Sequence, residues 1–212
     1  MSTNICYIVG AGENYGLDFK PQNNDLVIAA DGGLTYLLNA HIKPDLIMGD
    51  FDSLTEKPTN GEIIKLDINK DDTDTLAAVR KGIERNYNTF KIFCGTGGRI
   101  DHTMANIQTL AYLAYINKRG FLIGNDYIIT VIKDSKIKFE RIETGYISVF
   151  SFNDISSGVC IDGLKFNLKN ATLTNTYPIG VSNEFIGKES CISVKSGALI
   201  IVYPKNAKEQ DL

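Results

Sequence analysis

Three short segments in the first half of the chain combine acidic side chains with glycines, a combination suited to phosphate and metal chemistry. They are residues 49–54 (GDFDSL), 70–75 (KDDTDT) and 95–102 (GTGGRIDH). Each is predicted to lie where a strand ends and a helix is about to begin. In an open α/β sheet such strand ends meet at one edge, where ligands bind. The sequence therefore predicts one crevice that holds Asp50, Asp52, Asp74, Asp101 and Arg99.

The spacing of the first segment favours a metal site. Asp50 and Asp52 are two residues apart, so in extended backbone both side chains point to the same side. Carboxylates gathered in one crevice repel each other and need a cation, and Mg²⁺ suits oxygen ligands and phosphate-bearing substrates. The alternative is a polar turn in which Asp52 and Ser53 cap the local backbone.

The second segment has a strong structural alternative. Asp and Thr are preferred N-cap residues, and acidic residues in the first turn of a helix suit its dipole. Asp74 stands at the predicted helix start and faces the strand ends, so it is the best candidate metal ligand in this segment. The segment thus predicts a helix start with one functional carboxylate.

The third segment is typical of a phosphate site. Gly95, Gly97 and Gly98 let the backbone approach a bound group closely, and the following helix offers N–H groups to an anion. Arg99 adds a planar fork of donors that matches phosphate oxygens. Asp101 could accept a proton or bind metal. The alternative is a glycine turn with an aspartate N-cap.

Two familiar nucleotide-binding patterns are absent from the sequence. Gly10 and Gly12 follow the first apolar run and start like a dinucleotide fingerprint, but Tyr15 breaks the GxGxxG pattern. They could still form a tight turn near a nucleotide. No GxxxxGK[ST] sequence occurs, so a P-loop enzyme is excluded.

The order of strand-like and helix-like stretches predicts an α/β domain followed by an all-β domain. Residues 1–123 alternate between the two patterns, which implies a mostly parallel sheet covered on both faces. Residues 124–206 show no helical period, and predict a small antiparallel β-sandwich or flattened barrel. Residues 207–212 form a polar tail that we expect to be frayed. The strands expected in the second domain are 127–133, 136–142, 146–152, 158–168, 180–185, 191–195 and 198–203.

Composition excludes several classes of protein. The 212 residues are 43% hydrophobic and 22% charged, as in an ordinary globular protein, and the net charge is −3. No basic stripe indicates nucleic acid as a partner. No apolar run approaches the ~20 residues of a membrane span, and the N-terminus is unlike a signal peptide, so a cytoplasmic protein is expected. No CxxC pair occurs, and Cys6, Cys94 and Cys191 are expected to be buried, reduced thiols.

Taken together and in this order, the segments resemble the thiamine pyrophosphokinase family. That family shows ADGG, GDFDS, a DxTD-type helix start and a glycine-rich segment ending in GGRxDH, followed in its β domain by GLKYPL, GxSNEF and a closing strand. Here GLKFNL has Phe for Tyr and Asn for Pro. The matching residues are 30–33, 49–53, 72–74, 95–102, 163–168, 180–185 and 196–200.

The resemblance implies a fold and an activity. Such enzymes have a Rossmann-like α/β domain and a β-sandwich, need Mg²⁺ and act as homodimers with thiamine near the subunit interface. They transfer the terminal diphosphate of ATP to the hydroxyl of thiamine, which gives thiamine diphosphate and AMP. The partners expected here are therefore ATP, thiamine and a second copy of the chain, with no nucleic acid and no membrane.

The resemblance also assigns roles to residues. Asp50, Asp52 and Asp74 would hold Mg²⁺, and Arg99 would grip phosphate. Asp101 would bind metal or receive the alcohol proton. The residues implied in ATP binding are Asp31, Gly32, Gly95, Gly97, Gly98 and Arg99, and those implied in thiamine binding are Ser182 and Asn183. The chain has no Trp, so another ring, for which we suggest Phe185, would have to stack on thiamine.

Two other classes of function remain open from the residues themselves. A different Mg²⁺-dependent phosphotransferase or phosphohydrolase could use the same aspartates and would need no acceptor site in the β domain. A non-catalytic nucleotide- or thiamine-binding module would show no turnover. A purely structural domain has no reason to concentrate glycines, carboxylates and an arginine at strand ends.

Overall fold

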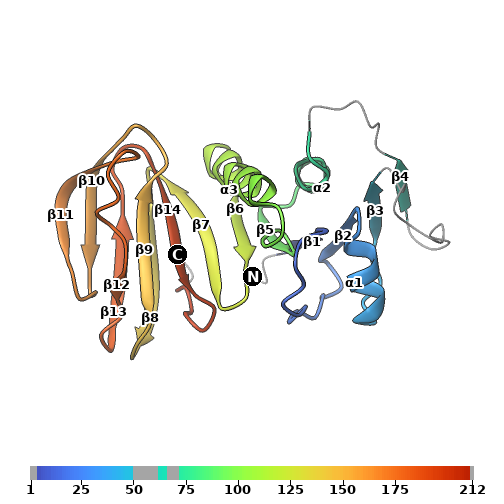
Figure 1. Ribbon diagram of the computed structural model, residues 1–212, viewed down its shortest axis with the longest axis horizontal. Coiled ribbons are helices and arrows are strands. Elements are labelled where there is room, and N and C mark those ends of the chain that lie inside the picture. Colours follow the sequence, from blue (N-terminus) through green and yellow to red (C-terminus); the bar gives the residue numbers. More distant parts are fainter. Residues whose placement is uncertain (1–3, 50–61, 66–71, 211–212) are drawn as a thin grey trace. The chain divides into compact units, whose positions relative to one another are not determined.

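The first unit of the fold is built on a parallel sheet. The computed structural model describes residues 4–49, 62–65 and 72–210 (Figure 1). The chain divides into two compact units. The first comprises Met1–Thr109 and Asn117–Asn125, and the second comprises Leu110–Ile116 and Asp126–Leu212. The predicted domain boundary at residues 123/124 stays a prediction.

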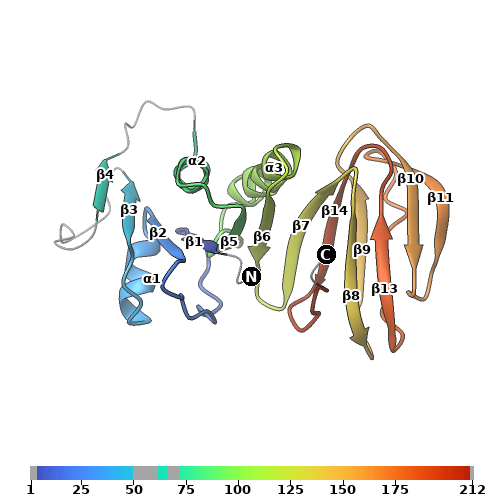
Figure 2. The ribbon, with the colours of Figure 1, turned by 180° about the vertical axis from the view of Figure 1, so that it is seen from behind.

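Short, mostly apolar segments of five residues form the central strands of the first unit. β1 (Ile5–Val9), β2 (Leu26–Ala30) and β5 (Thr89–Phe93) are almost wholly buried, as expected for a parallel sheet covered on both faces. The other strands are β3 (Leu46–Gly49), β4 (Glu62–Lys65) and β6 (Arg119–Ile123). Every described pairing in this unit is parallel, and the strand order is β6-β5-β1-β2-β3-β4 (Figure 2).

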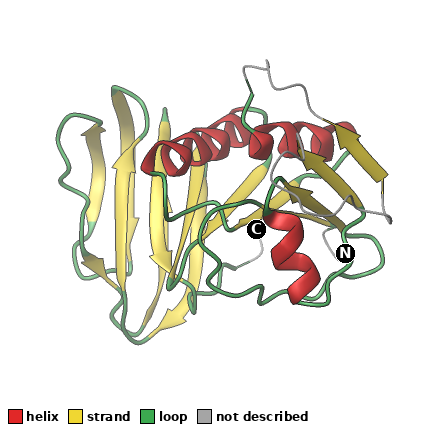
Figure 3. Cartoon of the chain, turned by 45° about the vertical axis from the view of Figure 1, so that its right-hand side comes forward, coloured by secondary structure: helices red, strands yellow, loops and turns green. Residues whose placement is uncertain are grey.

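Helices connect these strands and cover the sheet. α1 (Gly33–Asn39) and α2 (Asp74–Glu84) pack on opposite faces, and both contact β1 and β2 (Figure 3). α3 (Ile100–Tyr115) follows β5, and its first turn includes Asp101. α3 thus begins directly after the glycine-rich segment and Arg99. The mostly parallel α/β fold predicted for this half is confirmed.

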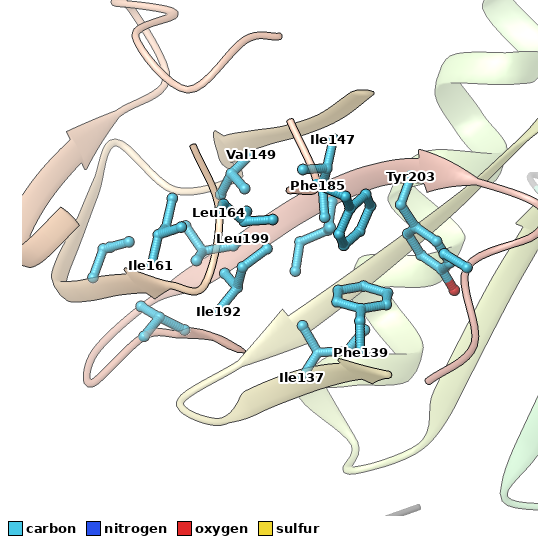
Figure 4. Packing of buried hydrophobic residues seen from close by; sticks show 14 of the residues in the cluster. Ile137, Phe139, Ile147, Val149, Ile161, Leu164, Phe185, Ile192, Leu199 and Tyr203 are labelled. Carbon is cyan, nitrogen blue, oxygen red and sulfur yellow. The ribbon is translucent and has the colours of Figure 1, made fainter. Parts of the chain in front are cut away.

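The second unit is a sandwich of two antiparallel sheets. One sheet has the order β12-β9-β14-β7 and the other β11-β10-β13-β8. Inward-facing residues of both sheets share one core, in which Phe139 packs edge-to-face against Phe185 and Tyr203 (Figure 4). The strands are β7 (Tyr127–Lys133), β8 (Lys136–Ile142), β9 (Tyr146–Ser151), β10 (Ile155–Asp162), β11 (Leu168–Thr174), β12 (Asn183–Glu184), β13 (Lys188–Ser193) and β14 (Ala198–Pro204).

Three expectations for the second half are corrected. The single strand expected at 158–168 ends at Asp162, because Gly163 has a φ of +77° and turns the chain, and β11 follows as a separate strand. The tail was expected to be frayed, but it is hydrogen-bonded to β8 up to Gln210, whose N–H donates to the carbonyl of Lys138 at 3.0 Å. Cys191 is half-exposed rather than buried, while Cys6 and Cys94 are buried as expected. None of the described helices is long and apolar enough to span a membrane.

Candidate active site

Two loops at the carboxyl edge of the first unit's sheet are joined by hydrogen bonds. They follow β1 and β5, which are parallel neighbours, so both loops leave the sheet at the same edge. The N–H of Gly12 donates to the carbonyl of Cys94 at 2.7 Å, and the N–H of Glu13 donates to the carbonyl of Thr96 at 3.0 Å. Residues 10–13 and 94–98 therefore form one layer, which we call the paired loops.

Glycine is required where the paired loops approach each other. A Cβ placed on Gly12 would lie 2.6 Å from the carbonyl oxygen of Cys94. Gly97 and Gly98 adopt φ angles of +80° and +59°, which L side chains rarely reach. The side chain of Asn106, which is 4% exposed, supports the loop from below and donates from Nδ2 to the carbonyl of Gly95 at 2.7 Å.

A cavity of about 530 Å³ opens above the paired loops. Its lining includes five of the residues predicted to bind ATP, namely Asp31, Gly95, Gly97, Gly98 and Arg99. The sixth, Gly32, does not line the cavity and is the N-cap residue of α1. The lining also contains residues for which no site role was predicted, namely Glu13, Tyr36, Thr75 and Asn106.

Asp31 enters the cavity from the neighbouring strand. It follows β2 and has a φ of +51°, a left-handed conformation that aspartate tolerates better than most residues. Its N–H donates to the carbonyl of Met48 at 2.8 Å, which ties this turn to the end of β3. The carboxyl ends of β1, β2 and β5 thus contribute jointly to one cavity. Of the described residues that were predicted to share one crevice, Arg99 lines this cavity, whereas Asp74 and Asp101 do not.

Arg99 and Asp101 form an exposed ion pair at the start of α3. Arg99 donates from Nε to Oδ1 of Asp101 at 3.2 Å and from Nη2 to Oδ2 at 2.5 Å. Their side chains are 74% and 59% exposed. The hydrogen bonds from Arg99 hold the pKa of the Asp101 carboxyl below its usual range, and the same contact raises the pKa of Arg99. Only Arg99 lines the cavity, so the contacts of Asp101 are those of a residue that orients Arg99.

Two residues of the acidic segment before α2 have structural contacts, and Asp74 remains a candidate metal ligand. Thr73 is the N-cap of α2, and its hydroxyl accepts from the N–H of Leu76 at 3.2 Å. Asp72 pairs with Arg80 at 2.7 Å. Asp74 is the first residue of the helix and half-buried, while the next residue, Thr75, lines the cavity.

The metal ligands predicted from the sequence are only partly within the described structure. Asp50 and Asp52 lie outside the described residues. Among the residues that are described, no group of three or more His, Cys, Asp or Glu side chains is arranged to hold a metal. The cavity does contain two carboxylate-bearing residues, Glu13 and Asp31. Because Mg²⁺ is usually held by one or two carboxylates together with substrate phosphates, the carboxylate of Asp31 fits the ion, whereas both oxygens of Glu13 already accept hydrogen bonds from Gly98 and Tyr15.

The Cys94 thiol in the cavity is not a candidate nucleophile. Burial raises its pKa to about 11, so the thiol is protonated at neutral pH. Only the thiolate is a good nucleophile or metal ligand. Cys94 therefore contributes through its backbone, whose positive φ of +52° turns the chain into the glycine loop.

The two residues predicted to bind thiamine lie in the second unit and have different environments. Ser182 is exposed with a φ of +58°, and its N–H donates to Oγ of Ser148 at 3.1 Å. Asn183 is 6% exposed, and its amide bonds to backbone: Oδ1 accepts from the N–H groups of Phe166 and Glu184, both at 2.9 Å, and Nδ2 donates to the carbonyl of Phe166 at 2.7 Å. Asn183 thus joins the segments 163–168 and 180–185.

The suggestion that Phe185 stacks on a ligand is wrong. Its side chain is 2% exposed and belongs to the sandwich core, with its ring centroid 5.5 Å from that of Phe139. Two exposed rings belong to residues paired with this segment. Phe166, whose backbone is hydrogen-bonded to the Asn183 side chain, is 58% exposed, and Tyr146, the strand partner of Glu184, is 70% exposed. These rings, rather than Phe185, are available to a ligand.

The first unit has the architecture of an α/β nucleotide-handling transferase. Its glycine loop, arginine fork and helix N-terminus meet at the carboxyl edge of a parallel sheet, an arrangement suited to anion binding. The pattern of the family described as "Thiamin pyrophosphokinase, catalytic domain" matches residues 20–121, and that described as "Thiamin pyrophosphokinase, vitamin B1 binding domain" matches residues 132–199.

Individual relatives agree with the family match. The chain is 31% identical over 184 residues to a thiamine pyrophosphokinase of Bacillus subtilis, with 84% of this chain and 86% of the relative covered. A solved thiamine pyrophosphokinase structure from the same organism superposes with a TM-score of 0.85 at 28% identity, over 96% of this chain and 100% of that one. A family member from Enterococcus faecalis shares the fold, with a TM-score of 0.83 at 24% identity over 96% and 100% of the two chains.

The chain therefore belongs to the thiamine pyrophosphokinase family, and it is an enzyme with the activity of that family. The resemblance seen in the sequence motifs is confirmed.

Proposed function

We propose that ATP binds in the cavity of the first unit with its phosphates on the paired loops. The observation that carries this placement is the convergence of the glycine loop, the Arg99 fork and the start of α3 on one cavity. Backbone N–H groups and a guanidinium are donors suited to phosphate oxygens. A volume of about 530 Å³ lies within the usual range for a small-ligand site.

In this proposal the hydroxyl oxygen of thiamine attacks the β-phosphorus of ATP. The new bond joins that oxygen to the β-phosphorus, the bond from the β-phosphorus to the α–β bridging oxygen breaks, AMP leaves, and the hydroxyl proton is released to solvent. A loose transition state of this kind needs little help from a base and depends on positioning and charge stabilisation. Arg99 supplies positive charge beside the phosphates, and Asp101 keeps its guanidinium oriented.

Mg²⁺ is proposed as the required ion. When bound, it would neutralise phosphate charge across the bond that breaks. Asp50, Asp52 and Asp74 remain the ligands proposed from the sequence, and Asp31 is a further oxygen donor in the cavity.

Thiamine is proposed to bind through the second unit. The vitamin B1 binding pattern covers Ser182 and Asn183. Ser182 is exposed and available to a ligand, whereas Asn183 acts by holding the segment that presents Ser182 beside Phe166. The exposed ring of Phe166 would attract the cationic thiazolium of thiamine. A homodimer and a cytoplasmic location, where ATP is supplied, complete the proposal.

Product identity tests the reaction directly. Incubation of the protein with ATP, Mg²⁺ and thiamine is expected to give AMP and thiamine diphosphate in equal amounts, with no AMP when thiamine is omitted. Chelation of the metal with EDTA is expected to lower the rate at least a hundredfold, because the phosphate charge is then no longer neutralised. ADP with thiamine monophosphate, or nucleotide hydrolysis without thiamine, would contradict the proposed reaction.

Substitution of Asn183 tests the thiamine side of the proposal. Asn183→Ala removes three hydrogen bonds to backbone groups and is expected to cost about 2 kcal/mol, or roughly 4–8 °C in unfolding temperature. It is also expected to raise KM for thiamine more than KM for ATP. Asn175→Ala is the control, since it removes one exposed amide contact to Asp154 in the same unit. An effect on KM for ATP alone would place this segment in another role.

A further inference from the structure

Glu13 places a carboxylate inside the cavity proposed to receive the phosphates of ATP. It follows the first glycine turn and lines the cavity. Its Oε1 accepts from the N–H of Gly98 at 3.2 Å, and its Oε2 accepts from the hydroxyl of Tyr15 at 2.6 Å. The carboxylate therefore accepts a hydrogen bond from a backbone N–H of the glycine loop. Such an N–H group is also the kind of donor that a phosphate oxygen would use.

The side chain of Glu13 lies along the loop rather than reaching it only at its tip. A Cβ placed on Gly97 would lie 2.6 Å from both Cγ and Cδ of Glu13. The backbone N–H of Glu13 is also fixed, because it donates to the carbonyl of Thr96. The carboxylate is thus held against the loop at both the backbone and the side chain.

Glu13 carries its negative charge at neutral pH. The hydrogen bonds from Tyr15, and next from Gly98, lower the pKa of its carboxyl from the ordinary value. The other charged residues that line the cavity are Asp31, which adds negative charge, and Arg99, whose guanidinium is already hydrogen-bonded to Asp101. An incoming triphosphate therefore meets carboxylates beside the donors that it needs.

We propose that Glu13 is a specificity-determining residue, an internal anion that competes with phosphate for the glycine loop and makes the cavity select metal-bound ATP over metal-free ATP. The inference rests on the proposed placement of ATP in this cavity. Metal-free ATP has the higher negative charge and is repelled more strongly by a fixed carboxylate, whereas a metal ion on the phosphates removes most of that repulsion. Because Glu13 is exposed, the effect is moderate and is screened by salt.

The test is the affinity for ATP, measured by titration calorimetry once in EDTA and once in excess Mg²⁺. Glu13→Gln keeps an oxygen that can accept from Gly98 and removes the charge. It is expected to tighten binding of metal-free ATP about five- to tenfold at low salt and to change the affinity for metal-bound ATP less than about twofold. Glu84→Gln, which removes one exposed charge from α2 where Glu84 pairs with Lys81, is expected to change neither.

Two results would overturn the inference. One is an unchanged affinity of Glu13→Gln for metal-free ATP. The other is a loss of affinity for metal-bound ATP alone, which would make Glu13 a metal ligand instead. Arg99→Met in the same titrations separates the inference from the proposed placement. If Arg99→Met binds ATP like the wild type, ATP does not use this cavity and both proposals fail. If it binds more weakly while Glu13→Gln is unchanged, only the role of Glu13 fails.

Discussion

Arg99→Met is expected to lower kcat/KM for ATP by about two to three orders of magnitude while leaving the unfolding temperature unchanged. The guanidinium lines the cavity and is the one described side chain there whose donors and charge suit transferring phosphates. Its side chain is 74% exposed, so methionine removes little packing. Steady-state kinetics at saturating thiamine, together with thermal unfolding, measure the two quantities separately.

Arg99→Lys provides the matched control for this expectation. Lysine keeps the charge but lacks the planar fork that can bind Asp101 and phosphate together, so it should recover only part of the lost activity. A rate for Arg99→Met within tenfold of the wild type would remove Arg99 from the phosphate site.

The same experiment distinguishes two roles for Asp101. If Asp101 acts only by orienting Arg99, the double variant Arg99→Met/Asp101→Asn should be no slower than Arg99→Met, because the two changes then disrupt one unit. If Asp101 instead receives the alcohol proton, the second change should slow the reaction further. Its lowered pKa favours the orienting role, since it makes the carboxylate a weaker base.

The first half of the fold could be predicted because its strands follow a simple rule. Parallel strands covered on both faces read as short continuous apolar runs, as β1 and β2 do. The glycines and acidic residues that follow these strands then fall at one edge without further information. The convergence of Asp31, the glycine loop and Arg99 on one cavity is a consequence of strand order alone.

The polar strand β11 could not be predicted in the same way. Its sequence, LKNATLT, has only one buried residue, Leu173, so neither the period-two pattern nor an apolar run marks it. It forms because β10 offers a pairing edge, which is a tertiary property. The preceding turn at Gly163 has a similar origin, since a Cβ there would lie 2.0 Å from the carbonyl oxygen of Glu189.

The roles of Glu13 and Asn183 could not be predicted from the sequence, because they too depend on tertiary contacts. Glu13 meets Gly98 across 85 residues of sequence, and the broken dinucleotide fingerprint before it gave no reason to single it out. Asn183 stood in a motif associated with thiamine, yet residue type alone does not reveal that its amide is saturated by backbone partners. Motifs therefore indicate candidate regions, while the contacts separate the exposed residues from those that hold loops.

The second large effect is expected at Gly33, the first residue of α1. A Cβ at this position would lie 1.9 Å from the carbonyl oxygen and 2.6 Å from the carbonyl carbon of Val9, both backbone atoms at the end of β1. Neither atom belongs to a flexible side chain, so Gly33→Ala must separate α1 from β1. We expect a loss of about 3 kcal/mol or more, which is roughly 6–12 °C in the unfolding temperature of a chain of this size.

Gly32→Ala is the control that isolates the clash from helix propensity. Gly32 has a φ of −59° in the right-handed helical region, and its added Cβ would meet only Ala11, whose Cβ would lie at 3.3 Å and whose Cα at 3.8 Å. Alanine is intrinsically favoured over glycine in helical backbone, so propensity alone predicts that neither change is harmful. Thermal unfolding followed by circular dichroism should show Gly32→Ala within about 1 kcal/mol of the wild type. Equal unfolding temperatures for the two variants would mean that α1 does not pack on β1 this closely, and the position of Asp31 in the cavity would then have to be reconsidered.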